Sequence, residues 1–295
     1  MAETLQHRYA NVNGQSLHYV TAGTGKLMLF VHGFPEFWYE WFNQLHEFGK
    51  DHQAVALDMR GYNLSSKPAD VTAYRAKHLV EDLRQLIEHL GHKSCILVAH
   101  DWGGAAAWSF AATLPQYVEK LIIINSPHPA TFTRELVNNP AQQAASQYML
   151  LFRMDKAERV MSENNYARLA GMLRSAGSNG DWLTDHDLAQ YVEAWSQPGA
   201  VTGGLNYYRA APMYPPTDAD PGPAAITIDS KRVTVNVPTL VIWGEADSAL
   251  LPGNLDGLEQ YVPNLTLKRI PNGSHWVVHE QPEVVNNYIR NFIRS

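Results

Sequence analysis

The sequence lacks the features that mark several classes of protein. Its 295 residues include one cysteine, Cys95, so no internal disulfide bond is expected, and its apolar strand-like surroundings predict a packing role. No apolar run approaches the roughly 20 residues of a membrane-spanning helix, and the N-terminal stretch MAETLQHRYANVNG has no signal-peptide pattern. Basic runs are absent and the net charge is −6. We therefore expect a cytoplasmic protein with no nucleic-acid or membrane partner.

Sequence motifs that hold cofactors are also missing. The chain has no G-x-G-x-x-G stretch and no P-loop pattern. His275 and His279 are four residues apart, as a metal-binding pair on a helix can be, but only Glu280 stands nearby to complete such a site. The sequence therefore predicts neither a cofactor nor a metal ion.

Short apolar runs do occur, and they alternate with amphipathic segments. Hydrophobic residues make up 45% of the chain, which is enough for a sizeable core. Asn13-Gly14 predicts a hairpin turn between the first two strands. The runs predict strands at 7–14, 15–23, 26–33, 53–61, 95–100, 118–125, 237–247 and 265–270. Helical spacing is found at 39–49, 74–91, 103–115, 187–196 and 283–294.

Repeated alternation of strands and helices predicts a mostly parallel sheet with helices on both faces. The alternation stops near His128, and about a hundred residues follow that carry helical stretches and proline-rich loops such as PMYPPTDADPGP. The simplest organisation is an α/β core formed by residues 1–128 and 230–295, interrupted by a helical cap at residues 129–229.

A carboxylate stands at one predicted strand-to-helix turn, in the stretch LVAHDWGGAAAW. Such a turn lies at the carboxyl edge of a parallel sheet, where ligand pockets form. Gly103 and Gly104 keep the turn free of bulk, so the side chain of Asp101 is expected to project into a pocket. The structural alternative is that Asp101 only caps the following helix.

Three further stretches follow predicted strands. HGFPEFW contains a glycine and a proline that shape a loop, WGEAD ends in Asp247, and NGSHW contains His275. The order of Asp101, Asp247 and His275 along the chain is that of nucleophile, acid and histidine in α/β-hydrolases. His100 and His32 are expected to hold backbone in the neighbouring turns.

These stretches together resemble the epoxide hydrolase branch of the α/β-hydrolase superfamily. The motifs HGFPEFWYEW, DMRGYNLSSKP, HDWGG, WGEAD and NGSHWVVHEQPE stand in the order and spacing of that branch, over essentially the whole chain. The resemblance implies an α/β-hydrolase fold with a mostly parallel eight-stranded sheet and an inserted helical cap. SQYMLLF and GGLNYYRA resemble its two tyrosine motifs and point to Tyr148 and Tyr208, with Tyr207 as the alternative for the second.

The implied chemistry suits these residue types. An aspartate is ionised at neutral pH and can attack a saturated carbon without a base. The product is an ester on Asp101, and His275, oriented by Asp247, would activate the water that hydrolyses it. Backbone N–H groups of Phe34 and Trp102 would bind the oxyanion.

Two tyrosine hydroxyls would bind the epoxide oxygen and protonate it as the ring opens, since a phenol is a much better acid than water. Side chains of Trp102, Phe34 and Pro35 would contact the substrate. The sequence thus predicts hydrolysis of a small-molecule epoxide by water to a vicinal diol.

Two other functions use the same scaffold. A haloalkane or haloacid dehalogenase has the same aspartate nucleophile, but its halide needs weak N–H donors rather than tyrosine hydroxyls. A non-catalytic small-molecule receptor has no need of all three of Asp101, Asp247 and His275. Which epoxide is turned over, with which enantiopreference and in which oligomeric state, is not encoded in any motif of the chain.

Overall fold

The computed structural model describes residues 4–176 and 180–294, and its strands form one eight-stranded sheet. The spatial order is β1-β2-β4-β3-β5-β6-β7-β8. Each strand overlaps a stretch for which a strand was predicted, so the predicted eight-stranded sheet is confirmed. The strands are β1 (Gln6–Val12), β2 (Gln15–Ala22), β3 (Leu27–Val31), β4 (Gln53–Leu57), β5 (Cys95–His100), β6 (Val118–Ile124), β7 (Thr239–Gly244) and β8 (Leu265–Ile270).

The edge of the sheet begins with an antiparallel hairpin. Asn13 and Gly14 both have positive φ angles, +49° and +69°, which the tight turn between β1 and β2 requires. β2 is also antiparallel to β4, and all later pairs are parallel. Strands β3, β5 and β7 are buried along their whole length, which explains their continuous apolar sequences.

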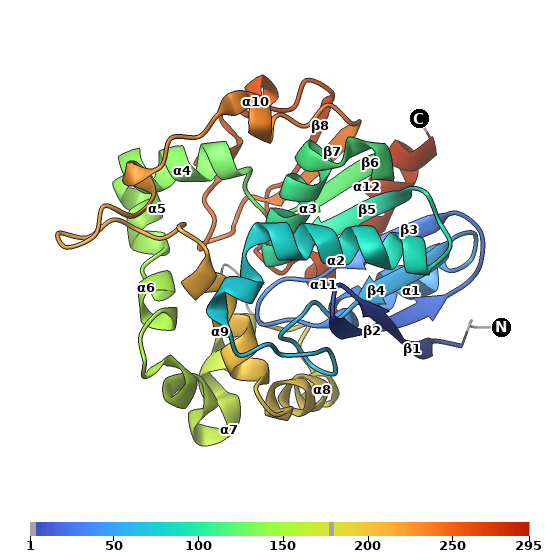
Figure 1. The fold of residues 1–295 in the computed structure, drawn as a ribbon, viewed down its shortest axis with the longest axis horizontal. Helices are drawn as coiled ribbons and strands as arrows, with labels where there is room; N and C mark the ends of the chain where they lie inside the picture. Colours follow the sequence, from blue (N-terminus) through green and yellow to red (C-terminus); the bar gives the residue numbers. More distant parts are fainter. Residues whose placement is uncertain (1–3, 177–179, 295) are drawn as a thin grey trace.

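Helices cover both faces of the sheet (Figure 1). α2 and α3 pack against each other on the near face, and α1 and α12 contact each other on the far face. The apolar stripe of α2, with Leu79, Leu83 and Leu86, is buried as its periodicity predicts. These helices and α11 are α1 (Phe42–Phe48), α2 (Ala76–His89), α3 (Asp101–Thr113), α11 (Val277–Glu280) and α12 (Pro282–Arg294).

Between β6 and β7 the described chain forms helices and loops that lie to one side of the sheet (Figure 1). α4 begins at Pro129, where the cap was expected to start. The helices are α4 (Pro129–Asn138), α5 (Pro140–Ala145), α6 (Tyr148–Phe152), α7 (Ala157–Leu173), α8 (Asp185–Ser196), α9 (Ala200–Ala210) and α10 (Ser230–Val233). The division into core and cap at residues 129 and 229 remains a prediction, and α10 lies just beyond it, in contact with α3.

Short 3-10 turns account for the remaining elements. η1 precedes α1 and η2 precedes α2, so the two helices predicted at 39–49 and 74–91 begin later than expected. In the described ranges, no helix has the length and apolar character needed to cross a lipid bilayer. The turns are η1 (Trp38–Trp41), η2 (Val71–Tyr74), η3 (Pro115–Tyr117), η4 (Gly222–Ala225), η5 (Pro252–Leu255) and η6 (Leu258–Gln260).

Candidate active site

Asp101 occupies a sharp turn between β5 and α3. Its φ angle is +46°, a left-handed conformation that costs an L-residue on the order of 1 kcal/mol or more. The turn fits because two neighbours lack a side chain. A Cβ atom on Gly103 would lie 2.2 Å from the carbonyl oxygen of Val31, and one on Gly104 would lie 2.3 Å from Ser126. The close packing of these glycines therefore fixes the direction of the Asp101 side chain.

The two carboxylate oxygens of Asp101 have different surroundings. Oδ1 accepts a hydrogen bond of 2.8 Å from the backbone N–H of Phe34, in the loop after β3. Oδ2 lies 3.8 Å from Nε2 of His275. The loop can approach so closely because Gly33 has no side chain. A Cβ atom at this position would lie only 2.4 Å from Cβ of Asp101. The carboxylate thus turns toward another loop, which disfavours the reading of Asp101 as a simple helix cap.

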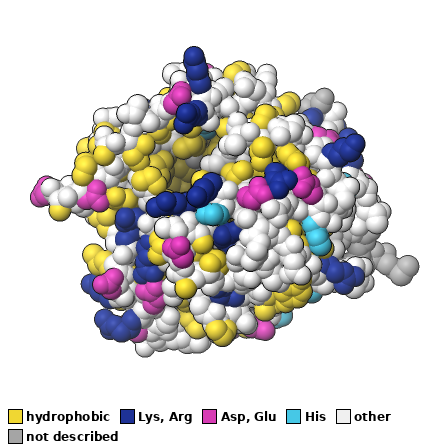
Figure 2. Space-filling model, viewed as in Figure 1, with side chains coloured by type: hydrophobic (Ala, Val, Ile, Leu, Met, Phe, Trp, Pro, Cys, Tyr) yellow, Lys and Arg dark blue, Asp and Glu magenta, His cyan; other side chains and the backbone are white. Residues whose placement is uncertain are grey.

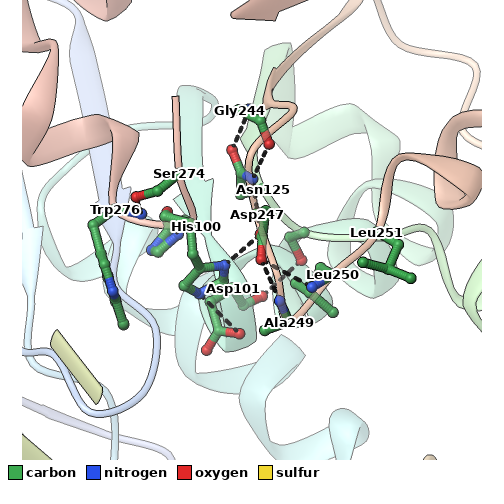
Figure 3. A network of polar contacts seen from close by, with 12 residues as sticks. His100, Asp101, Asn125, Gly244, Asp247, Ala249, Leu250, Leu251, Ser274 and Trp276 are labelled. Carbon is green, nitrogen blue, oxygen red and sulfur yellow. Dashed lines mark hydrogen bonds and ion pairs between the residues drawn. The ribbon is translucent and has the colours of Figure 1, made fainter. Parts of the chain in front are cut away.

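His275 is held from its other side by Asp247. Nδ1 of the imidazole is 2.7 Å from Oδ2 of Asp247, which follows β7. The second oxygen of Asp247 accepts hydrogen bonds from the backbone N–H groups of Ala249 and Leu250, at 2.8 and 2.9 Å (Figure 3). These hydrogen bonds fix the orientation of the buried carboxylate beside His275.

Asn125 was not identified in the sequence. It directly follows β6 with a φ angle of +36°, and its Nδ2 donates to Oδ2 of Asp247 at 2.9 Å. Its amide also exchanges hydrogen bonds with the backbone of Gly244 (Figure 3). Asn125 therefore joins the end of β6 to the turn that carries Asp247. The feature of the sequence that could have indicated Asn125 is its position as a polar residue at the carboxyl end of the apolar run VEKLIIIN.

The charge state of His275 follows from its burial and its neighbours. Burial alone lowers the pKa of a histidine, but the negative charges of Asp247 and Asp101 act against it and raise the pKa of His275 to about 9. At neutral pH the imidazole is therefore a cation between two carboxylates.

The two predicted tyrosines lie on α6 and α9, and their rings are in contact. The centroids of Tyr148 and Tyr208 are 6.2 Å apart. Burial is the main cause that raises the pKa of each well above its usual value, and the charge of Asp101 contributes to both. Both phenols therefore keep their protons at neutral pH.

Tyr207, the alternative to Tyr208, points elsewhere. Its hydroxyl donates a hydrogen bond of 2.8 Å to the carbonyl oxygen of Arg60. Its ring packs against Tyr62 and Tyr74. Because this hydroxyl is bound to the core backbone, the geometry favours Tyr208 as the partner of Tyr148.

Of the residues predicted to contact the substrate, Trp102 and Phe34 pack against Tyr208, whereas Pro35 contacts a different part of the cap. The ring of Trp102 packs edge-on against Tyr208, with centroids 5.0 Å apart, and the ring of Phe34 does so at 5.3 Å. Pro35 lies against the cap, where its carbonyl oxygen accepts a hydrogen bond of 2.7 Å from Nε1 of Trp195. Within the described chain, Phe34 N–H donates to the Asp101 carboxylate, and a donation from Trp102 N–H remains a prediction.

A cavity of about 770 Å³ opens beside these residues, within the range of small-molecule sites. Figure 2 shows a hollow bordered by hydrophobic side chains on this face of the molecule. The cavity brings together the carboxylate of the α3 turn, one cap tyrosine and a mainly apolar wall. Its lining includes Asp101, Trp102, Ala105, Ser126, Pro129, Phe132, Tyr148, Met149, Pro212, Met213, Ile226, Ile228, Val233 and Leu250.

The other histidines of the motifs have structural partners, and two of them form hydrogen bonds with backbone atoms. Nε2 of His100 is 3.0 Å from the carbonyl oxygen of His275. His32 is 2.8 Å from the carbonyl oxygen of Gly33 and accepts a hydrogen bond from the N–H of Met59. His279 pairs with Glu36 instead of approaching His275. Over the described ranges no cluster of histidine, cysteine and acidic residues suits a metal ion.

Comparison with known proteins gives consistent matches over nearly the whole chain. A family model described as the alpha/beta hydrolase fold matches residues 26–282. Epoxide hydrolase 4 of Mus musculus is 38% identical over 299 residues, which span 98% of this chain and 80% of that protein. The AB hydrolase superfamily protein YfhM of Bacillus subtilis is 36% identical, with 98% of both chains covered.

Solved structures agree with these sequence matches. The Bacillus megaterium epoxide hydrolase, in a crystal structure with an inhibitor, superposes with a TM-score of 0.90 at 43% identity, covering 98% of this chain and 100% of that one. Epoxide hydrolase VrEH1 from Vigna radiata superposes with a TM-score of 0.82 at 28% identity, with 98% of each chain covered.

Proposed function

This chain belongs to the epoxide hydrolases of the alpha/beta hydrolase fold family, which open epoxides to diols, and we propose that it does so through a covalent ester on Asp101. One observation carries the proposal. The carboxylate of Asp101 lines the mainly apolar cavity, is held by the N–H of Phe34, and has its other oxygen directed at His275. A dehalogenase would share the nucleophile, but the pair of Tyr148 and Tyr208 supplies the hydroxyl groups that an epoxide oxygen needs and a halide does not.

In the first step Oδ2 of Asp101 attacks an epoxide carbon, because Oδ1 is already engaged by Phe34. The C–O bond of the epoxide breaks as the new ester bond forms. Its electron pair stays on the epoxide oxygen, which takes a proton from a hydroxyl of Tyr148 or Tyr208. Both phenols are protonated in the buried site, so they are available for this transfer.

In the second step the ester is hydrolysed. Nε2 of His275 removes a proton from water, and the water oxygen bonds to Cγ of Asp101. The negative charge then develops on Oδ1, where the N–H of Phe34 already points. Loss of one such donor raises a barrier by about 2.7–4 kcal/mol. Collapse of this intermediate breaks the bond between Cγ and Oδ2, and the departing diol oxygen takes the proton from His275. Asp101 is left as a carboxylic acid that carries the second proton of the water, and transfer of this proton to the tyrosinate left by ring opening restores both side chains.

The role of the tyrosines is tested by removing both hydroxyls. The double variant Tyr148→Phe, Tyr208→Phe is expected to lose epoxide opening by about 10²–10⁴-fold, the usual contribution of general acid catalysis. Ester formation with a glycidyl ether is measured by mass spectrometry and diol formation by chromatography. The matched control Tyr207→Phe removes the bond to Arg60 and is expected to keep ring opening. Normal diol formation by the double variant contradicts the assignment.

The pKa of His275 predicts how each step depends on pH. Asp101 raises that pKa while it is ionised, and esterification removes its charge. The pKa of His275 in the ester is therefore lower than about 9, and neutral imidazole becomes available for the second step. Ester hydrolysis should rise with pH until His275 is neutral, whereas ring opening should lack this rise. Single-turnover rates across pH measure both, and ester hydrolysis that slows with rising pH contradicts the role of His275.

The substrate is a small-molecule epoxide, as the relatives' names indicate, and its size is proposed to be set by the apolar cavity. A panel of styrene-like, aliphatic and fatty epoxides beside haloacids would identify the preferred class. Turnover of haloacids alone would overturn the proposal. A cytoplasmic location remains a prediction from composition and the N-terminal sequence.

A further inference from the structure

Two glutamates are buried next to the loop after β3, and the reaction described above uses neither. Glu36 and Glu40 are 1% and 2% exposed. A buried carboxylate is costly unless it is paired or protonated. Glu36 is paired, since its oxygens contact Nε2 of His279 at 2.9 Å and the hydroxyl of Tyr191. Burial opposes ionisation there, but His279 and Tyr191 outweigh it and lower the pKa of Glu36.

Glu40 has a different environment. Its Oε2 accepts a hydrogen bond of 3.1 Å from the backbone N–H of Gly33, the residue before the Phe34 donor. Its Oε1 lies 2.7 Å from Nδ1 of His100. Burial and the negative charge of Glu36 raise the pKa of Glu40 well above its usual value, and Asp101 adds to this while His279 opposes it. The surroundings thus favour the protonated acid.

The hydrogen bonds of His100 decide where its own proton lies. Nε2 is 3.0 Å from the carbonyl oxygen of His275, which only accepts, so Nε2 must carry hydrogen. Burial and the nearby charge of His275 lower the pKa of His100 to about 4, so the ring is neutral. Nδ1 therefore presents a lone pair to Oε1 of Glu40.

Two lone pairs at 2.7 Å would repel each other if Glu40 were ionised. The direction of this contact falls short of an ideal hydrogen bond, and in the described chain neither atom has another hydrogen-bond partner. A proton on Oε1 turns the repulsion into an attraction and, with the ring of His100 neutral, satisfies both buried atoms.

We propose that Glu40 is a positioning residue that acts as a protonated carboxylic acid, donating to Nδ1 of His100 while it accepts from the N–H of Gly33. This pair connects three loops, because Gly33 precedes the Phe34 donor and His100 precedes Asp101 and also holds the backbone of His275. The inference rests on the proposed function, in which those loops supply the oxyanion donor, the nucleophile and the base.

The connection matters most for ester hydrolysis, the step in which the Phe34 donor and His275 act together on one carbon. Glutamine reproduces the hydrogen-bond pattern of a protonated glutamate, with an oxygen toward Gly33 and an N–H toward His100. Leucine fills similar space and makes neither bond. Glu40→Gln therefore tests whether a neutral side chain with the same hydrogen bonds can replace Glu40. Glu40→Leu tests whether packing alone is sufficient.

Single-turnover rates of ester formation and ester hydrolysis test the proposal in Glu40→Gln and Glu40→Leu. Glu40→Gln is expected to hydrolyse the ester within about threefold of the parent rate. Glu40→Leu should slow that step by at least about tenfold, part of the 10²–10³-fold effect of losing a whole oxyanion donor. Ester formation should change less in both. Glu135→Leu removes a buried glutamate that contacts Arg134 and Asn139, and serves as the matched control.

Infrared spectroscopy of the intact protein tests the proton directly and does not depend on turnover or on the folding of Glu40→Leu. The difference spectrum between the parent protein and Glu40→Gln should contain the carbonyl stretch of a protonated carboxylic acid. A carboxylate band in its place overturns the proposal, as does a Glu40→Gln variant as slow as Glu40→Leu, or a folded Glu40→Leu with unchanged ester hydrolysis. Failure of the parent protein to form any ester instead overturns the proposed function, and the infrared result still stands.

Discussion

Substitution of Asp101 by asparagine is expected to abolish diol formation, with a loss on the order of 10⁴–10⁶-fold, as for removal of a covalent nucleophile. Asparagine keeps the size of the side chain and an oxygen for the N–H of Phe34, but it has no charged oxygen to attack carbon. Steady-state diol formation measures the loss, and mass spectrometry of the protein should show no ester. Asp256→Asn, at an exposed position, controls for a generic change of charge.

Isotope labelling gives the same prediction an independent readout. In one turnover with enzyme in excess in ¹⁸O-water, the parent protein should incorporate label into Asp101 and release unlabelled diol. This follows because the diol receives Oδ2 of Asp101 and water replaces that oxygen. Label found in the diol alone would mean that water attacks the epoxide directly, and the covalent route would then be wrong.

Substitution of His275 by glutamine is expected to stop the reaction between its two steps. Ring opening needs Asp101 and a proton donor, whereas ester hydrolysis needs a base, so the alkylated protein should accumulate. Turnover should fall by about 10²–10⁴-fold, the usual contribution of a general base. Intact-protein mass spectrometry would detect the added mass of the epoxide, and peptide mapping would locate it at Asp101.

A second substitution separates orientation from basicity. Asp247→Asn keeps the shape of the side chain beside His275 and removes the charge that raises its pKa. The Asp247→Asn variant should therefore accumulate less of the ester intermediate than the His275→Gln variant does. If His275→Gln stays unmodified by substrate and turns over at the parent rate, the histidine has no part in the hydrolysis.

The central strands could be predicted from the sequence because burial on both faces demands continuous apolar runs, and such runs are visible in one dimension. LMLFV of β3 and CILVAH of β5 are examples. Helix starts were less accurate. η2 separates from α2 because Arg75 has an extended conformation, and no composition rule indicated that change.

The position of the candidate residues along the chain was likewise a local property. Asp101, Asp247 and His275 each follow a strand, so the parallel arrangement alone places them at one edge of the sheet. The choice between Tyr207 and Tyr208 was not local, because both lie on α9 and they differ in their tertiary contacts: the hydroxyl of Tyr207 bonds to the carbonyl of Arg60, whereas the ring of Tyr208 packs against Tyr148.

The sequence by itself determined the sheet, the turn at Asp101 and the kinds of side chain at its edge, since these depend on hydrophobic periodicity and on residues next to each other in the chain. Tertiary structure alone decided the partners. Asn125 meets Asp247 and Glu40 meets His100 across 122 and 60 positions of the chain. Hydrogen bonds and charge interactions act over a few ångströms, so the protonation states of His275 and Glu40 exist only once the loops have been brought together.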